Sequence, residues 1–370
     1  MLYPLYAVLF ADTGLSAAQI SSLFILWSVA GFVLDVPTGV LADLLPRRAL
    51  LVVAPLANGV GFALWTFLPS YPAFAAGFVL WGAGAALRSG TYQALAHTEL
   101  ARYGAAHAYE RVIGRSRAAG VTAQLLAAAL AAPVHAAGGY RALGAVSVAA
   151  MLLCAAVGRT LPASRPPAPE EGEEVPGFTT VLRGGLRALR HTPRARRAAL
   201  LFAVVTGFAA LDEYVPLLVD ATGAGPAALP LLVGLVTAGA AAGGWLAGRG
   251  PRGAAGPLAL GALCLAAGSL AGSPLGLLGV AVAFGVFEWA TALTDARLQA
   301  AVPDASRATV TSLAGFGSEL CAVLVFAGYA VGAQALGPGP VFAVCALPYL
   351  LASVSEFRQS RRRRARTLEE

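Results

Sequence analysis

The chain has 370 residues, of which 58% are hydrophobic and only 12% are charged. Because an average soluble domain is about 25% charged, this composition excludes a water-soluble globular fold. All 26 basic residues are arginine, and the net charge is +7. These arginines flank apolar segments, where positive residues set the orientation of membrane helices, so we expect no nucleic-acid partner. A lysine-free chain this rich in alanine, glycine and arginine is typical of a bacterial source.

Apolar stretches of membrane-spanning length recur along the chain. A helix needs about 20 apolar residues to cross a bilayer. Met1 to Phe10 has about half that length, which predicts the outer half of an incomplete first helix. The sequence therefore predicts an all-α polytopic membrane protein with twelve transmembrane helices, the first incomplete. The other spans are predicted at residues 18–42, 49–69, 73–95, 116–134, 141–158, 198–219, 227–248, 257–272, 274–296, 308–330 and 338–357.

The chain is predicted to form two bundles of six helices. Gly39, Leu41 and Ala42 recur 205 residues later as Gly244, Leu246 and Ala247, at the same end of the second helix of each half. Duplicated halves of this kind are common in transporters. The predicted bundles are residues 1–158 and 198–357, with a cytoplasmic linker at 159–197 and a basic cytoplasmic tail at 358–370.

The linker begins with a run rich in proline and glutamate, which predicts an extended, solvated segment. Its residues 178–190 place leucines at helical spacing among arginines, which favours a helix lying on the inner leaflet. A plain solvated connector is the alternative.

Arginine placement predicts the orientation. If the turn after the second helix is cytoplasmic, 24 of the 26 arginines are cytoplasmic, and only Arg88 and Arg141 lie elsewhere. Cytoplasmic loops of membrane proteins carry such an excess of arginine. We therefore predict a bacterial cytoplasmic-membrane protein with both termini in the cytoplasm.

A polar motif ends the second predicted span. Asp35, Gly39, Asp43 and Arg47 are four residues apart, so they share one helix face, and Asp43 can pair with Arg47 one turn on. Gly39 leaves room for a neighbouring helix. Arg48 completes a basic pair.

This segment resembles the signature between the second and third helices of the major facilitator superfamily (MFS), in which glycine, leucine, alanine and aspartate precede a turn and a basic pair. Two departures stand out: Pro46 replaces the family's glycine, and Gly248 replaces the aspartate in the second-half copy. The resemblance implies the MFS fold. It also implies an inner gate formed by Asp35, Gly39, Asp43, Arg47 and Arg48; the alternative is a turn that only sets topology.

Acidic residues at membrane depth are the candidates for proton coupling. An ionised side chain there costs about 2.5 to 3.5 kcal/mol even on the lenient insertion scale, so it usually marks a cavity, an ion pair or a proton relay. The candidates are Asp212, Glu213, Glu288 and Glu319. Asp212 and Glu213 are adjacent, so they cannot face the same groove equally. A structural hydrogen-bonding role is the alternative for Glu288 and Glu319.

The resemblance also implies substrate-cavity residues, because helices one, four, seven and ten line the central cavity in the family. Arg88 looks like the family's fourth-helix arginine and needs an acidic partner or an anionic cargo. Tyr92, Tyr214 and Trp289 are aromatic candidates for the same cavity, although aromatic residues at membrane depth are more often packing residues or interface anchors.

The expected function is secondary transport by alternating access, driven by the proton gradient without a bound cofactor. Our first hypothesis is antiport, the efflux of small amphipathic or hydrophobic compounds in the manner of a multidrug transporter. The alternatives are a proton symporter for a small polar or anionic solute, and a sensor or scaffold that does not transport. The sequence has no HExxH, GxSxG or metal-spaced cluster, so we expect neither an enzyme nor a metal site. The expected partners are a small-molecule substrate, protons and the lipid bilayer, and we expect a monomer.

Overall fold

The computed structural model describes residues 1–88, 91–162, 191–225, 227–247, 253–302 and 307–369. All regular elements of these residues are helices, which confirms the all-α prediction for this part of the chain. The chain divides into two compact units, Met1–Gly172 and Glu173–Glu370. The predicted inner-leaflet helix at 178–190 lies outside the described residues, and the bundle boundaries stay a prediction.

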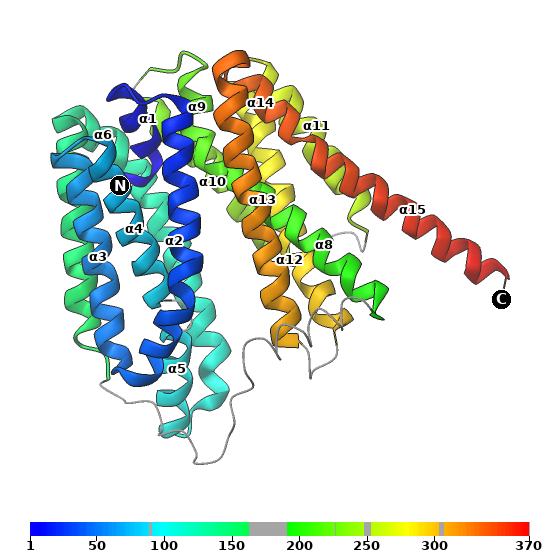
Figure 1. Ribbon diagram of the computed structural model, residues 1–370, viewed down its shortest axis with the longest axis horizontal. Coiled ribbons are helices and arrows are strands. Elements are labelled where there is room, and N and C mark those ends of the chain that lie inside the picture. The colour runs from blue at the N-terminus through cyan, green and yellow to red at the C-terminus, as the bar shows by residue number, and fades with distance from the viewer. Residues whose placement is uncertain (89–90, 163–190, 226, 248–252, 303–306, 370) are drawn as a thin grey trace. The chain divides into compact units, whose positions relative to one another are not determined.

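The first unit follows the predicted spans closely (Figure 1). Its elements are η1 (Tyr3–Leu5), α1 (Tyr6–Asp12), α2 (Ala17–Leu44), α3 (Arg47–Phe67), α4 (Tyr71–Arg88), α5 (Thr91–Arg102), η2 (Ala106–Ala108) and α6 (Tyr109–Gly158). The fourth predicted span ends at residue 95, whereas α5 continues to Arg102. Hydropathy locates only the apolar part of a helix. The backbone hydrogen bonds of the helix continue into the polar residues that follow, so the helix ends later than predicted.

Helix α6 contains two predicted spans joined by a sharp bend. Gly138 and Gly139 leave the helical conformation there, and Gly139 has a φ of 61°, which favours glycine. After the bend, Gly144 lies beside Thr66 and Gly158 beside Leu51, so the second half runs antiparallel to α3. The two helical halves of α6, before and after the bend, therefore correspond to the fifth and sixth predicted spans.

The short helix α1 is buried inside the first unit. Tyr6 and Phe10 are 1% and 0% exposed, and the ring of Tyr6 lies 5.6 Å from that of Trp65 on α3. The Leu2 amide donates to Ser147 Oγ at 3.0 Å, and the Tyr140 hydroxyl donates to Asp12 Oδ2 at 2.7 Å. These contacts fix α1 and the residues next to it against α3 and the second half of α6.

The second unit contains the remaining helices. Its elements are α8 (Pro193–Phe208), η3 (Ala209–Tyr214), α9 (Val215–Asp220), α10 (Leu229–Trp245), α11 (Ala255–Leu270), α12 (Gly276–Ala301), α13 (Arg307–Leu336), α14 (Pro338–Cys345) and α15 (Leu347–Glu369). The seventh predicted span is thus divided into α8, η3 and α9, and the last into α14 and α15. Within the described residues, seven helical segments are long and apolar enough to cross a membrane.

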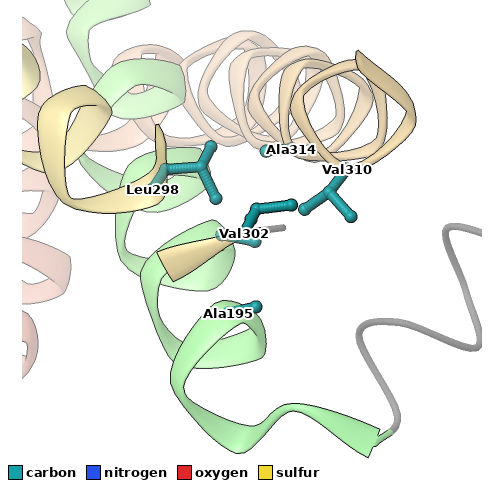
Figure 2. Packing of buried hydrophobic residues seen from close by; sticks show 6 residues of the cluster. Ala195, Leu298, Val302, Val310 and Ala314 are labelled. Carbon is teal, nitrogen blue, oxygen red and sulfur yellow. The ribbon is translucent and has the colours of Figure 1, made fainter. Parts of the chain in front are cut away.

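A small apolar cluster joins α8, α12 and α13 at their arginine-rich ends. Figure 2 shows Ala195 of α8, Leu298 of α12 and Val310 of α13 directed toward a shared centre. Val302 and Ala314 belong to the same cluster. The side chains of all five residues are at most 4% exposed. Lipid tails are as apolar as these residues, so close van der Waals packing, rather than escape from water, stabilises such a cluster within a membrane.

Helices α10 and α12 pack through small residues. A Cβ built on Gly243 would overlap the carbonyl oxygen of Gly285, and one built on Gly239 would overlap that of Ala281. The two backbones therefore touch, as in other small-residue helix interfaces of membranes.

Replacing Gly243 by alanine should destabilise the second unit. The added methyl group meets backbone atoms of Gly285, and such overpacking costs about 1–3 kcal/mol. The neighbouring variant Gly244→Ala is the matched control, because its Cβ would make an ordinary 3.6 Å contact with Glu288. Thermal unfolding of the purified protein in detergent measures the difference, and equal midpoints for the two variants would contradict the proposed contact.

Candidate functional site

The acidic pair Asp212 and Glu213 lies where the seventh predicted span is interrupted. Both residues belong to η3, between α8 and α9. Pro216 explains the interruption, because proline lacks an N–H and its ring clashes with the carbonyl four residues earlier, at Asp212. A 3₁₀ segment within a longer helix often marks a functional hinge. The pair therefore occupies an irregular segment of the membrane-spanning region.

The two adjacent carboxyl groups have different surroundings. The Asp212 side chain is exposed, whereas that of Glu213 is only 7% exposed. Successive residues of a 3₁₀ helix point about 120° apart. The pair thus presents one carboxyl group at the surface of the unit and keeps the other within it.

The second unit brings a third predicted carboxyl group to this pair. Asp212 lies close enough to Glu213 and to Glu288 of α12 for their charges to repel it. Glu288 is exposed, and its Cγ faces Gly244 of α10. Three of the four proton-coupling candidates therefore form one group, which we call the acidic cluster: Asp212, Glu213 and Glu288. The fourth candidate, Glu319, lies on α13 and is exposed.

Stacked aromatic rings support the acidic cluster. Tyr214 is fully buried, and its ring stacks on Tyr329 of α13 with centroids 3.6 Å apart. Phe287, next to Glu288, stacks on Tyr349 of α15 at the same distance. The Tyr349 hydroxyl donates to the carbonyl of Val205 at 3.4 Å. These rings hold the segments on either side of the acidic cluster in place.

The predicted aromatic cavity residues differ in exposure. Tyr214 and Trp289 are 0% and 8% exposed, so both pack inside the second unit. Tyr92, on α5, is half-buried. Arg88 is exposed at the end of α4, and the described residues contain no ion pair involving it. Of the four cavity candidates, Arg88 therefore offers the most accessible side chain.

The gate motif lies at the junction of α2 and α3. Asp35, Gly39 and Asp43 fall in the last turns of α2, but their side chains lie outside the described part of the structure. The Arg47 guanidinium donates to the Ala94 carbonyl at 3.0 Å and to Thr98 Oγ1 at 2.7 Å. Arg47 thus ties the start of α3 to α5. The predicted pairing of Asp43 with Arg47 stays a prediction.

One buried carboxyl group was not predicted. Glu99 of α5 is 8% exposed, and neither of its oxygens has a hydrogen-bond partner within the described residues. The predicted fourth span ends at residue 95, so Glu99 lies beyond it. The spacing of Thr91, Leu95 and Glu99, four residues apart on one helix face, is the signal that identifies it.

Three solved structures of transporters share this fold. One is a crystal structure of a mutant of the nucleoside transporter NupG. The match covers 96% of this chain and 94% of the NupG chain, at 14% identity and a TM-score of 0.73. The match with a D-xylose-proton symporter covers 95% of this chain and 90% of the symporter, at 17% identity and a TM-score of 0.69. The match with an auto-inhibited POT family peptide transporter covers 98% of this chain and 94% of that transporter, at 14% identity and a TM-score of 0.69. At these identities the likeness establishes the fold alone.

A family model extends the assignment beyond the fold. None of the curated protein sequences compared with this chain matches it. The model of the Major Facilitator Superfamily, however, matches residues 1–325. Together with the apolar helices, this match confirms the resemblance carried by the motif at Asp35 to Arg48. The chain is a multi-pass membrane protein of the Major Facilitator Superfamily.

Proposed function

We propose that this protein is a proton-coupled secondary transporter that works by alternating access of its two six-helix halves. The family membership supports secondary transport of a small molecule. The acidic cluster at the interrupted span supports proton coupling, and it is the observation on which the proposal rests. We propose the bacterial cytoplasmic membrane as its location, with both termini cytoplasmic.

The physical basis for coupling is the repulsion within the acidic cluster. Like charges repel one another more strongly where water is scarce. Binding a proton at Asp212 removes the repulsion between this residue and its neighbours Glu213 and Glu288. Because Asp212 lies in the irregular segment η3, a change in that repulsion acts on a part of the span held by fewer regular backbone hydrogen bonds. Proton binding thereby favours one arrangement of the span over another.

The direction of transport has two candidates. Our first hypothesis is efflux of small amphipathic or hydrophobic compounds. The second is uptake of a small polar or anionic solute, which the exposed Arg88 would suit. Two proteins of the same fold, a nucleoside transporter and a D-xylose-proton symporter, also raise uptake as a candidate. A sensor or scaffold that moves no solute is the remaining alternative.

Purified protein in liposomes should distinguish these functions. For an exporter, an inward proton gradient should drive extrusion of an amphipathic dye. For a symporter, adding the solute should make the outside medium alkaline as protons enter with it. Protein-free liposomes are the control. If neither dye nor any solute in a broad panel moves, transport itself is excluded in favour of a sensor or scaffold.

Replacing Asp212 by asparagine and Glu213 by glutamine should abolish proton-driven transport. The amides keep the size of the side chains but cannot carry a proton on and off. Exchange of labelled for unlabelled substrate at equal pH should persist, since it needs no net proton movement. The control is Asp12→Asn, which removes an exposed carboxylate bound only to Tyr140 among the described contacts. Retained gradient-driven flux in the double variant would eliminate the acidic pair as the coupling site.

Arg88→Gln should weaken transport of an anionic solute and leave a neutral one unaffected. A hydrogen bond to a charged group contributes about 1.5–3 kcal/mol, so KM for the anion should rise about tenfold or more. Arg88→Lys keeps the charge but loses the planar guanidinium group with its paired N–H donors. Its KM for the anion should therefore lie between the values of the wild type and of Arg88→Gln. Equal KM values in wild type and Arg88→Gln would remove Arg88 from the substrate site.

A further inference from the structure

A groove separates parts of α11 and α15, two helices that lie side by side in the second unit (Figure 1). It is open on one side and has a volume of about 420 Å³. The wall formed by α11 consists of the small residues Ala255, Gly256 and Ala259. A Cβ built on Gly256 would meet no atom within 4 Å, so the space above this glycine is open.

The opposite wall is apolar with a basic end. Val354 and Phe357 of α15 line the groove and are 47% and 54% exposed. Ser353 does not offer a free hydroxyl, because it donates to the Ala255 carbonyl at 2.6 Å. Arg358 is the only charged residue among those lining the groove, and it is exposed. The groove thus combines an apolar trough with a guanidinium group at one end.

The chain becomes strongly basic directly beyond the groove. Helix α15 continues to Glu369, and its sequence contains five more arginines after Arg358, at positions 361–364 and 366. This is the arginine-rich end of the spans, which the orientation proposed above places at the cytoplasmic leaflet. That leaflet carries anionic lipids, which attract clustered arginines next to a membrane helix.

We propose that the groove binds an acyl chain of an anionic phospholipid whose phosphate group is held by Arg358. The apolar trough matches the hydrocarbon chain, and the guanidinium group matches the phosphate in charge and in its planar array of donors. The arginines that follow add attraction for the negative headgroup without defining its position. None of the residues lining the groove belongs to the acidic cluster or to the gate motif, so the lipid site does not depend on the transport mechanism.

The proposal is tested by lipid titration of the purified full-length protein in detergent, read by thermal unfolding and by native mass spectrometry. The probes are phosphatidylglycerol, phosphatidylcholine and inorganic phosphate. Arg358→Gln removes the phosphate ligand, and Gly256→Leu fills the trough. The matched controls are Arg194→Gln, at another exposed arginine, and Gly315→Leu, at another glycine with open space around its Cβ.

Phosphatidylglycerol should stabilise and bind the wild type at lower concentration than phosphatidylcholine. Arg358→Gln should raise the required concentration about tenfold or more, because it removes a hydrogen bond to a charged group, and Gly256→Leu should abolish the bound lipid seen by mass spectrometry. Equal behaviour of each variant and its control would overturn the proposal, even if the lipid binds elsewhere. So would stabilisation by inorganic phosphate alone, which would identify the ligand as a free anion.

Discussion

In lipid, the backbone hydrogen bonds of a membrane-spanning helix have to be made by the protein itself. Without water in the hydrocarbon core, each N–H and C=O must bond within its own helix, because every unsatisfied group costs several kcal/mol. Long regular helices are therefore the rule, and a break needs a cause. Pro216 supplies one in the seventh predicted span, where η3 replaces the regular ladder. The acidic pair lies in that break, so the least regular part of the span is also its most polar part.

Close packing of small residues links the rest of the second unit to this segment. Between membrane helices there is no gain from excluding water, so attraction depends on how closely the backbones approach. Contact of Gly243 with Gly285 brings α10 against α12. One turn beyond Gly285, Glu288 faces Gly244, and its negative charge repels that of Asp212. The glycine contact thus helps to determine where the third carboxyl group of the acidic cluster lies.

The sequence predicts the spans well and their ends poorly, for a physical reason. About 20 apolar residues are needed inside lipid, and this requirement locates the long apolar helices of the described residues. Outside the lipid, a helix continues wherever its residues tolerate it, so α5 reaches Arg102 and α15 reaches Glu369. Glu99 was missed because it lies in such an extension. The break at η3 was also missed, although Pro216 is visible in the sequence, because hydropathy does not register the loss of an N–H.

For the candidate site, sequence predicts which groups are charged at depth but not how they divide their roles. Asp212 and Glu213 are equivalent in sequence, and only the backbone of η3 makes one exposed and the other buried. The different surroundings of the two adjacent acids thus follow from the turn of a single 3₁₀ segment.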